Sequence, residues 1–305
     1  MSDAARKARR LAACLMLLGF ASAHAASVPP KLKVYVSVDM EGVAGVVTGD
    51  QLAPGGFEYE RFRRFMTDET LAAIRAAKEA RATEVVVSDS HGNGENLLIE
   101  SFPADVRVIR SWPRHGGMMA GLDGSFDAAL LIGCHASTSS ARGVRAHTFS
   151  SAYFTRVALN GNPVSESEFS AAYAGSLGVP VAFASGDDAA LAEIRARLPQ
   201  IETVETKQAL SFHAASSLTP AESARRIAIG VRAALKRVTV MKPYVLATPV
   251  TLEIAFKNYR PAELLSYLRP VERVDAHTIR FTGRDMAEIA DFVSVIDSYS
   301  PELAP

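Results

Sequence analysis

Two carboxylates that follow an apolar run near the start of the chain could together bind a cation. Asp39 and Glu41 come directly after the apolar residues 34–38, and Gly42 follows them. A continuously apolar run is typical of a parallel strand that is covered on both faces. Two neighbouring carboxylates repel each other, so the pair needs a cation or a shared proton. The alternative is that Asp39 only caps a helix that begins after the strand.

Four further residues with metal-binding or proton-transferring side chains follow other predicted elements, in most cases the ends of strands. They are His91, His135, His147 and Glu166. Open α/β sheets bind their ligands beyond the carboxyl ends of the strands, so these side chains could share one site with Asp39 and Glu41. Taken alone, a histidine in a turn could be an ordinary surface residue, and Glu166 could be a carboxylate at a helix N-terminus.

The combined set offers oxygen and nitrogen ligands of the kind that suit zinc or manganese, especially as a pair of ions. Its metal-ligand candidates are Asp39, Glu41, His91, His135 and Glu166. One carboxylate can bridge two ions about 3.5–4 Å apart, as in two-metal hydrolases. Such a pair polarises a carbonyl or phosphoryl oxygen and ionises water near neutral pH. His147 could then transfer the proton that hydrolysis requires.

The elements that would position these residues predict an α/β fold. A helix over about residues 58–80 connects the strand at 32–38 to a strand at 84–88, which makes a right-handed βαβ unit with parallel strands. Further strands are predicted at 106–109 and 128–132. We therefore expect a mostly parallel sheet flanked by helices, with three layers in all.

The second half of the chain contains fewer polar clusters. A hairpin is predicted over residues 152–166, because Asn160-Gly161 is a strong turn signal. The remaining predicted helices lie at about 169–177, 189–198, 219–236, 262–268 and 284–299, and the remaining strands at 181–184, 250–256 and 278–281. From these patterns we divide the chain into a signal peptide (1–25), a metal-binding catalytic α/β domain (26–214) and a smaller C-terminal α/β subdomain (215–305).

A few other residues of the same chemical types receive a structural assignment. Cys134 adjoins His135, but alternation along a strand turns its side chain to the opposite face, so we assign it to the core. Three histidines have no candidate partner in the sequence, and we expect them to be structural or surface residues. They are His115, His213 and His277.

The composition is that of a globular protein that does not bind nucleic acid. The 305 residues are 48% hydrophobic and 22% charged, and the formal net charge is zero. The first 25 residues resemble an export signal, since basic residues precede the apolar residues 11–20 and Ala23-His24-Ala25 is a cleavage sequence. A membrane anchor is the alternative, although the apolar run is short for a bilayer. We expect export to the periplasm or secretion, with no membrane association after cleavage.

Four segments of the chain resemble the DppA-type D-aminopeptidase family. Residues 37–42 read S-V-D-M-E-G, and 89–91, 133–136 and the segment around Glu166 follow in the order of that family. The resemblance is good from about residue 33 to 207 and looser from there to the C-terminus. It implies a binuclear zinc aminopeptidase, with two Zn²⁺ per chain. The residues that would match its metal ligands are Asp39, Glu41, His91, His135 and Glu166. Asp39 would match the bridging ligand and His147 the catalytic histidine.

Two features depart from the pattern of that family. The loop between His135 and His147 is one residue longer than the resemblance predicts, and the chain carries an export signal although the family is cytoplasmic. An exported enzyme would meet D-amino-acid peptides that are released from the cell wall. The family forms ring-like assemblies, so the resemblance also implies a homo-oligomer.

The sequence thus predicts an exported zinc-dependent aminopeptidase. It would hydrolyse short peptides with an N-terminal D-amino acid, such as D-Ala peptides, by means of a water that two metal ions activate. One alternative is a two-metal hydrolase of another amide or of a phosphoester. A second alternative is a non-catalytic, metal-containing protein that binds peptides, because resemblance in fold alone does not establish activity.

Overall fold

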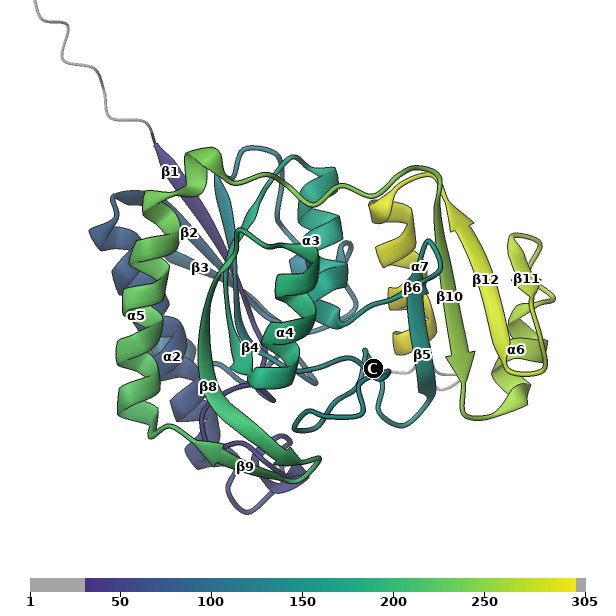
Figure 1. The fold of residues 1–305 in the computed structure, drawn as a ribbon, viewed down its shortest axis with the longest axis horizontal. Helices are drawn as coiled ribbons and strands as arrows, with labels where there is room; N and C mark the ends of the chain where they lie inside the picture. Colours follow the sequence, from purple (N-terminus) through teal and green to yellow (C-terminus); the bar gives the residue numbers. More distant parts are fainter. Residues whose placement is uncertain (1–30, 300–305) are drawn as a thin grey trace, which may run out of the picture. The chain divides into compact units, whose positions relative to one another are not determined.

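The computed structural model describes residues 31–299 (Figure 1). The predicted signal peptide, residues 1–25, lies outside the described residues. Within residues 31–299, no helix combines the length and the apolar character that a membrane span requires.

Within the described residues, a larger sheet of seven strands has the order β3-β2-β1-β4-β7-β8-β9. Its strands are β1 (Leu32–Val38), β2 (Ala82–Asp89), β3 (Val106–Ile109), β4 (Ala128–Cys134), β7 (Val181–Asp187), β8 (Glu202–Ser211) and β9 (Ala214–Ser217). All neighbours from β3 to β8 are parallel, and β9 is antiparallel to β8. The order reverses between β1 and β4, and such a switch point opens a crevice beyond the carboxyl ends of the two strands.

Helices cover both faces of the larger sheet (Figure 1). α2 (Tyr59–Glu79) and α5 (Pro220–Lys236) lie side by side on one face, and α3 (Glu166–Ser176) and α4 (Asp188–Arg197) pack on the other. Short 3₁₀ helices lie in the connections and are η1 (Gly49–Gln51), η2 (Ile99–Ser101), η3 (Gly117–Met119) and η4 (Val238–Val240).

The sequence of α5 explains why it covers the sheet. Ile227, Val231 and Ala234 are spaced by four and three residues, and they form one fully buried stripe. The helix begins with proline at its first position, and the side chain of the N-cap Thr219 accepts a hydrogen bond from the N–H of Glu222. Local signals fix where the helix begins, and the apolar stripe fixes which side faces the sheet.

A smaller antiparallel sheet has the order β11-β12-β10-β5-β6 within the described residues. Its strands are β5 (Phe154–Leu159), β6 (Asn162–Pro163), β10 (Val250–Phe256), β11 (Val271–Arg273) and β12 (Thr278–Gly283). The predicted turn joins β5 to β6, and Asn160 and Gly161 both have a positive φ, as a tight hairpin requires. α6 (Tyr259–Leu265) packs on β10, β11 and β12, and α7 (Met286–Ser298) lies between α3 and this sheet (Figure 1).

The predicted fold class is confirmed, since the chain is an α/β protein with a mostly parallel sheet between helices. The boundary predicted between residues 214 and 215 does not coincide with the division between the sheets. β5 and β6 precede it and yet belong to the sheet of β10, while α5 follows it and packs on β7 and β8. The reason is long-range pairing, in which Val157 and Leu159 lie opposite Ile254 and Leu252.

Three strands and the start of one helix differ from the predictions. The sequence predicts no strand for β8, β9 or β11, because their residues are largely polar or exposed and lack a buried apolar run. α3 begins at Glu166, three residues before the predicted start. Ser165 and Glu168 exchange side-chain and backbone hydrogen bonds in a capping box, which begins the helix earlier than its apolar residues indicate.

Candidate metal centre

The six candidate residues converge beyond the carboxyl end of the larger sheet. Asp39 and Glu41 follow β1, while His91 and His135 follow β2 and β4, the two neighbours of β1 in the sheet. The other two come from outside the sheet, since Glu166 begins α3 and His147 lies in the loop after β4. The buried members of the set are Asp39, Glu41, His91, His135 and Glu166, and His147 is half-buried.

Asp39 connects two groups of potential ligand atoms. In the first group, Nδ1 of His91 lies 3.2 Å from Oδ1 of Asp39 and 2.8 Å from Oε2 of Glu41. In the second group, Nε2 of His135 lies 3.2 Å from Oδ2 of Asp39 and 3.3 Å from Oε2 of Glu166. Each group contains one imidazole nitrogen and two carboxylate oxygens, and Asp39 contributes one oxygen to each.

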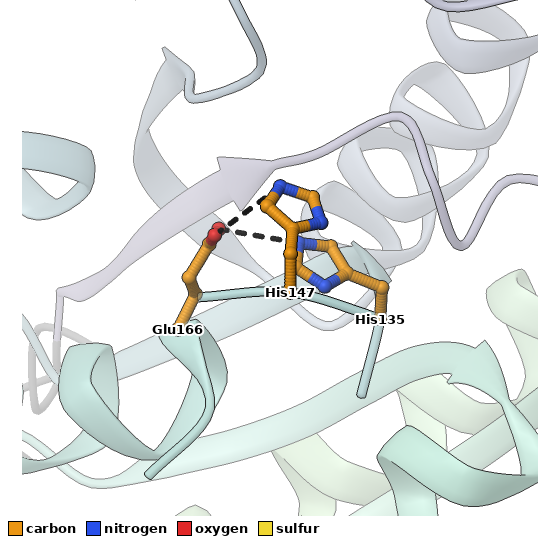
Figure 2. A group of neighbouring side chains, drawn as sticks. All are labelled: His135, His147 and Glu166. Atoms are coloured by element: carbon orange, nitrogen blue, oxygen red, sulfur yellow. Dashed lines mark ion pairs between the residues drawn. The ribbon is translucent and has the colours of Figure 1, made fainter. Parts of the chain in front are cut away.

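His147 lies over the second group (Figure 2). Its ring stacks on that of His135, with centroids 4.1 Å apart and planes inclined by 4°. Its Nε2 lies 3.7 Å from Oε1 of Glu166 and 4.0 Å from Oε1 of Glu41. The other nitrogen, Nδ1, donates to the carbonyl oxygen of Arg145 at 2.7 Å, so Nε2 is the nitrogen that faces the cluster.

Backbone carbonyls also orient the two buried histidines. Nε2 of His91 donates to the carbonyl oxygen of Leu52 at 2.7 Å, and Nδ1 of His135 donates to that of Ala136 at 3.1 Å. A neutral imidazole carries one proton, so these bonds leave Nδ1 of His91 and Nε2 of His135 as lone-pair donors. Hydrogen bonds of this kind commonly orient the histidines that bind metal ions in proteins.

The donor set fits zinc. Within the described residues, Oε2 of Glu41 and Nε2 of His135 are buried without a hydrogen-bond partner. A buried polar atom without a partner costs stability, so both atoms are expected to bind a ligand. Carboxylate oxygen and neutral imidazole nitrogen are ordinary ligands of zinc.

The charges within the cluster favour a cation strongly. Burial, followed by the negative charge of Glu41, raises the pKa of Asp39. Burial would also raise the pKa of Glu41, but His91 and the other histidines hold it well below its usual value. For His91 and His135 burial is the largest influence and acts to lower the pKa. The carboxylates around them nevertheless raise it well above the usual value, Glu41 most strongly for His91 and Glu166 for His135. The carboxylates therefore stabilise positive charge at both histidines, whether a proton or a metal ion supplies it.

Lys207 supports the backbone of the loop over residues 39–46. It lies in β8, and its side chain is almost completely buried. Its Nζ donates to the carbonyl oxygens of Glu41, Val43 and Val46, the last two at 2.9 and 2.6 Å. Because the acceptors are backbone atoms distant in sequence, no sequence motif indicates this role of Lys207.

Two glycines allow the ends of β1 and β4 to meet. The N–H of Gly42 donates to the carbonyl oxygen of Gly133 at 2.7 Å. A Cβ at Gly42 would lie 2.1 Å from the carbonyl oxygen of Cys134, and a Cβ at Gly133 would lie 2.1 Å from that of Asp39. Gly133 also has a φ of +76°, which favours glycine. This close approach brings the side chains of Asp39 and His135 together.

Asp89 lies two residues before His91 but supports the loop instead of joining the cluster. Its carboxylate accepts hydrogen bonds from the N–H groups of Asn96 and Leu97 at 2.6 and 2.8 Å. The side chain of Asn96 donates in turn to the carbonyl oxygen of His91 at 2.7 Å. Asp89 therefore positions His91 through the backbone.

A cavity of about 160 Å³ opens beside the cluster. The side chains that give it an apolar wall are Trp112, Met118, Met119, Phe149, Phe169 and Val293. α7 contributes Val293, Ser294 and Asp297 to this lining. The sequence predicts no site residue beyond residue 214, because the pattern of a helix does not show that one of its faces meets a cavity.

The residues assigned to structure are not members of the cluster. His115 is exposed as expected, but it does have a partner, since its Nδ1 lies 2.9 Å from Oδ2 of Asp291. His213 and His277 are exposed. Cys134 is buried among apolar residues as predicted, and burial raises the pKa of its thiol to about 12.

The fold and the site define an α/β protein with a centre of histidines and carboxylates at the switch point of its sheet. The chain belongs to the D-aminopeptidase family, whose sequence profile matches residues 32–295. The predicted family and the predicted enzyme class, a metallo-aminopeptidase, are thereby confirmed.

Two comparisons with individual proteins agree with this membership. The chain is 34% identical over 260 residues to a D-aminopeptidase of Bacillus subtilis (strain 168). The matched region covers 84% of this chain and 93% of that protein. It is also similar to the solved structure of DppA from Bacillus subtilis, described as a Zn-dependent D-aminopeptidase and a self-compartmentalizing protease. The TM-score is 0.83 and the identity 32%, with 88% of this chain and 99% of the other covered.

Proposed function

We propose that this enzyme removes an N-terminal D-amino acid, such as D-Ala, from short peptides and that it uses two zinc ions per chain. The observation that carries the two-metal proposal is the position of Asp39, whose two oxygens lie 3.2 Å from the nitrogens of two different histidines. A carboxylate in this position can bridge two ions. The zinc dependence and the D-peptide substrate are supported by the relatives, which are named for them.

Six atoms from five residues would hold the two ions. Oδ1 of Asp39, Oε2 of Glu41 and Nδ1 of His91 would hold one, and Oδ2 of Asp39, Nε2 of His135 and Oε2 of Glu166 would hold the other. When bound, a zinc pair polarises the scissile carbonyl and lowers the pKa of water towards neutrality.

His147 would transfer protons at its Nε2. That atom is half-buried and faces the cluster, because the bond from Nδ1 to the carbonyl oxygen of Arg145 fixes the orientation of the ring. A histidine in this position can accept a proton from the attacking water and donate one to the leaving amine. The apolar side chains of Trp112 and Phe149 in the cavity lining would limit access of other water.

We also propose that the enzyme is exported and that it forms a homo-oligomer. The basic and apolar residues before residue 26 favour export, which would bring the enzyme to D-amino-acid peptides from the cell wall. A homo-oligomer is supported by the relative that is described as a self-compartmentalizing protease.

The test is hydrolysis of D-Ala-D-Ala and L-Ala-L-Ala by residues 26–305, after chelation and again after zinc is restored. We expect zinc-dependent cleavage of the D-peptide and little cleavage of the L-peptide. p-Nitrophenyl phosphate serves as a control substrate, because the same ligand types occur in two-metal phosphatases. Cleavage of the phosphoester alone, or of neither peptide by protein with bound zinc, would overturn the proposed substrate.

A further inference from the structure

We propose that Asp297 binds the α-ammonium group of the substrate and so makes the enzyme select a free N-terminus. This inference rests on the proposed aminopeptidase function and adds a substrate-binding residue to it. The residue lies in the last turn of α7, outside the strand-end cluster.

The position of Asp297 in the cavity carries the inference. Val293 and Asp297 are four residues apart on α7, so they lie on one face of the helix, and both line the cavity. Among the described lining residues, Asp297 is the one carboxylate outside the metal centre, and the lining includes no lysine or arginine. Outside the metal centre the described lining residues therefore carry a single negative charge, that of Asp297, and a carboxylate in this position favours a cationic group. A peptide substrate brings one cation near its scissile bond, its α-ammonium group.

No structural role within the described residues accounts for this carboxylate. Between residues 31 and 299, no hydrogen bond or ion pair engages the side chain of Asp297, unlike Asp291 on the same helix, which contacts His115. A negative charge near a helix C-terminus is unfavourable, because the helix dipole places partial negative charge there. The carboxylate therefore costs stability where it stands, which is typical of a residue kept for binding.

The electrostatic surroundings of Asp297 agree with this role. The residue is exposed to solvent where the cavity opens, yet the protein around its carboxylate and the charge of Glu166 raise its pKa to about 6. The carboxylate is thus mostly ionised at neutral pH, and an ammonium group beside it would favour the ionised form further. Glu166 belongs to the metal centre and lines the same cavity as Asp297.

Three contacts would then hold the N-terminal residue. Its carbonyl group lies at the metal centre and His147, its ammonium group at Asp297, and its side chain against the apolar wall that includes Phe169. Three fixed contacts around one carbon distinguish D from L, because inversion moves at least one group away from its partner. The same arrangement explains why a peptide without a free amine would bind poorly.

The experiment compares Asp297→Asn with the wild type, both loaded with zinc, on D-Ala anilide and on propionanilide, which lacks the amine. We expect kcat/KM for the amine substrate to fall roughly 10- to 100-fold, the usual effect of losing a charge-assisted hydrogen bond, with zinc content unchanged. Propionanilide should be unaffected. Each compound is also tested as a competitor of D-Ala-D-Ala cleavage, so that one that is not cleaved still reports its affinity.

Controls separate this inference from the proposed function. Asp291→Asn, on the same helix but outside the cavity lining, should leave both substrates unaffected. Asp297→Glu should restore part of the preference for the amine. Equal loss on both substrates, or no loss on the amine, would overturn the inference, and the second result would place the amine on the metal ions. If the wild type cleaves no D-peptide, the proposed function fails, and calorimetric binding of D-alaninamide and propionamide to both proteins still tests Asp297.

Discussion

Two clusters of buried ionisable side chains contact the loop over residues 39–46, and they satisfy their charges in different ways. In the metal centre, carboxylates and imidazoles face one another, and Oε2 of Glu41 and Nε2 of His135 have no hydrogen-bond partner within the described residues. In the second cluster, Lys207 and Glu69, which we call the support, Lys207 donates to three backbone carbonyls. Oε1 of Glu69 accepts from the N–H of Ala44 at 3.1 Å and from Ser223 at 2.7 Å.

The metal centre has the features of a binding site, whereas Lys207 and Glu69 have those of an internal support. Side chains that are already hydrogen-bonded to the backbone fix the path of the chain and have few free polar atoms to offer a ligand. Side chains that face one another with free lone pairs can bind an ion between them. The bonds of Glu69 connect α2 to the loop and to α5, and those of Lys207 connect β8 to the loop. The support therefore holds the metal-binding loop in place through backbone atoms, among them the carbonyl oxygen of Glu41.

The largest effect should follow from changing the residue that the two ligand groups share. Asp39→Asn keeps the shape of the side chain but removes the charge that two histidines contact. We expect zinc content to fall from two ions per chain to none, with activity lost, because both sites lose a ligand. Elemental analysis of the purified variant measures this, and Asp291→Asn is the control. Retention of one tightly bound ion would show that Asp39 does not bridge.

His147→Ala should have the second largest effect, because it removes the proton-transferring side chain and leaves the metal ligands in place. We expect kcat to fall by about 10²- to 10⁴-fold, the usual contribution of a general acid or base. The zinc content should not change, since five other residues supply the ligands. The exposed His213 provides the matched control, His213→Ala. An undiminished kcat would remove His147 from the mechanism.

Lys207→Met tests the support directly. The change leaves three buried carbonyls without their donor, so we expect the free energy of unfolding of the zinc-free protein to fall by about 3 kcal/mol. Zinc affinity should weaken by roughly 10-fold, because the backbone at Glu41 is less restrained. Urea unfolding and competition with a chelator measure the two effects. The control is Lys236→Met, which changes an exposed lysine. A stable variant with much weaker zinc binding would instead assign Lys207 to the metal centre.

The same two clusters show how far the sequence alone could predict the molecule. Asp39, His91 and His135 each follow a buried apolar run, and that local pattern predicts both the strand and the position at its end. Lys207 could not be predicted, because β8 has no apolar run and the acceptors of its ammonium group are backbone atoms more than 160 residues away.

The pairing of strands in the smaller sheet could not be predicted for a related reason. β5 pairs with β10, and the partners are about 90 residues apart, as Leu159 and Leu252 show. Periodicity predicts a strand but does not indicate its partner. For this reason the sequence placed β5 with the catalytic domain and predicted no role for α7 in the cavity. Asp297 is therefore a residue that only the packing of α7 against α3 reveals.

Glu69→Gln should have the smallest effect, and its sign decides whether the support is an ion pair. Burial raises the pKa of Glu69 from 4.5 to about 7, and its Oε2 has no partner within the described residues. The folded protein then binds this proton more tightly than the unfolded chain. The stabilising contribution of the protonated carboxyl is fully present below about pH 4.5 and is lost as the pH rises through about 7.

Glutamine keeps the neutral, hydrogen-bonded form at every pH. The free energy of unfolding of the variant, minus that of the wild type, should therefore rise by about 2 kcal/mol between about pH 5 and pH 8. Urea unfolding of both zinc-free proteins across that range measures the difference. A difference that stays constant or falls would mean that Glu69 is ionised throughout and stabilised by Lys207. The support would then be a buried ion pair, and the contrast with the metal centre would reduce to the two unpartnered atoms, Oε2 of Glu41 and Nε2 of His135.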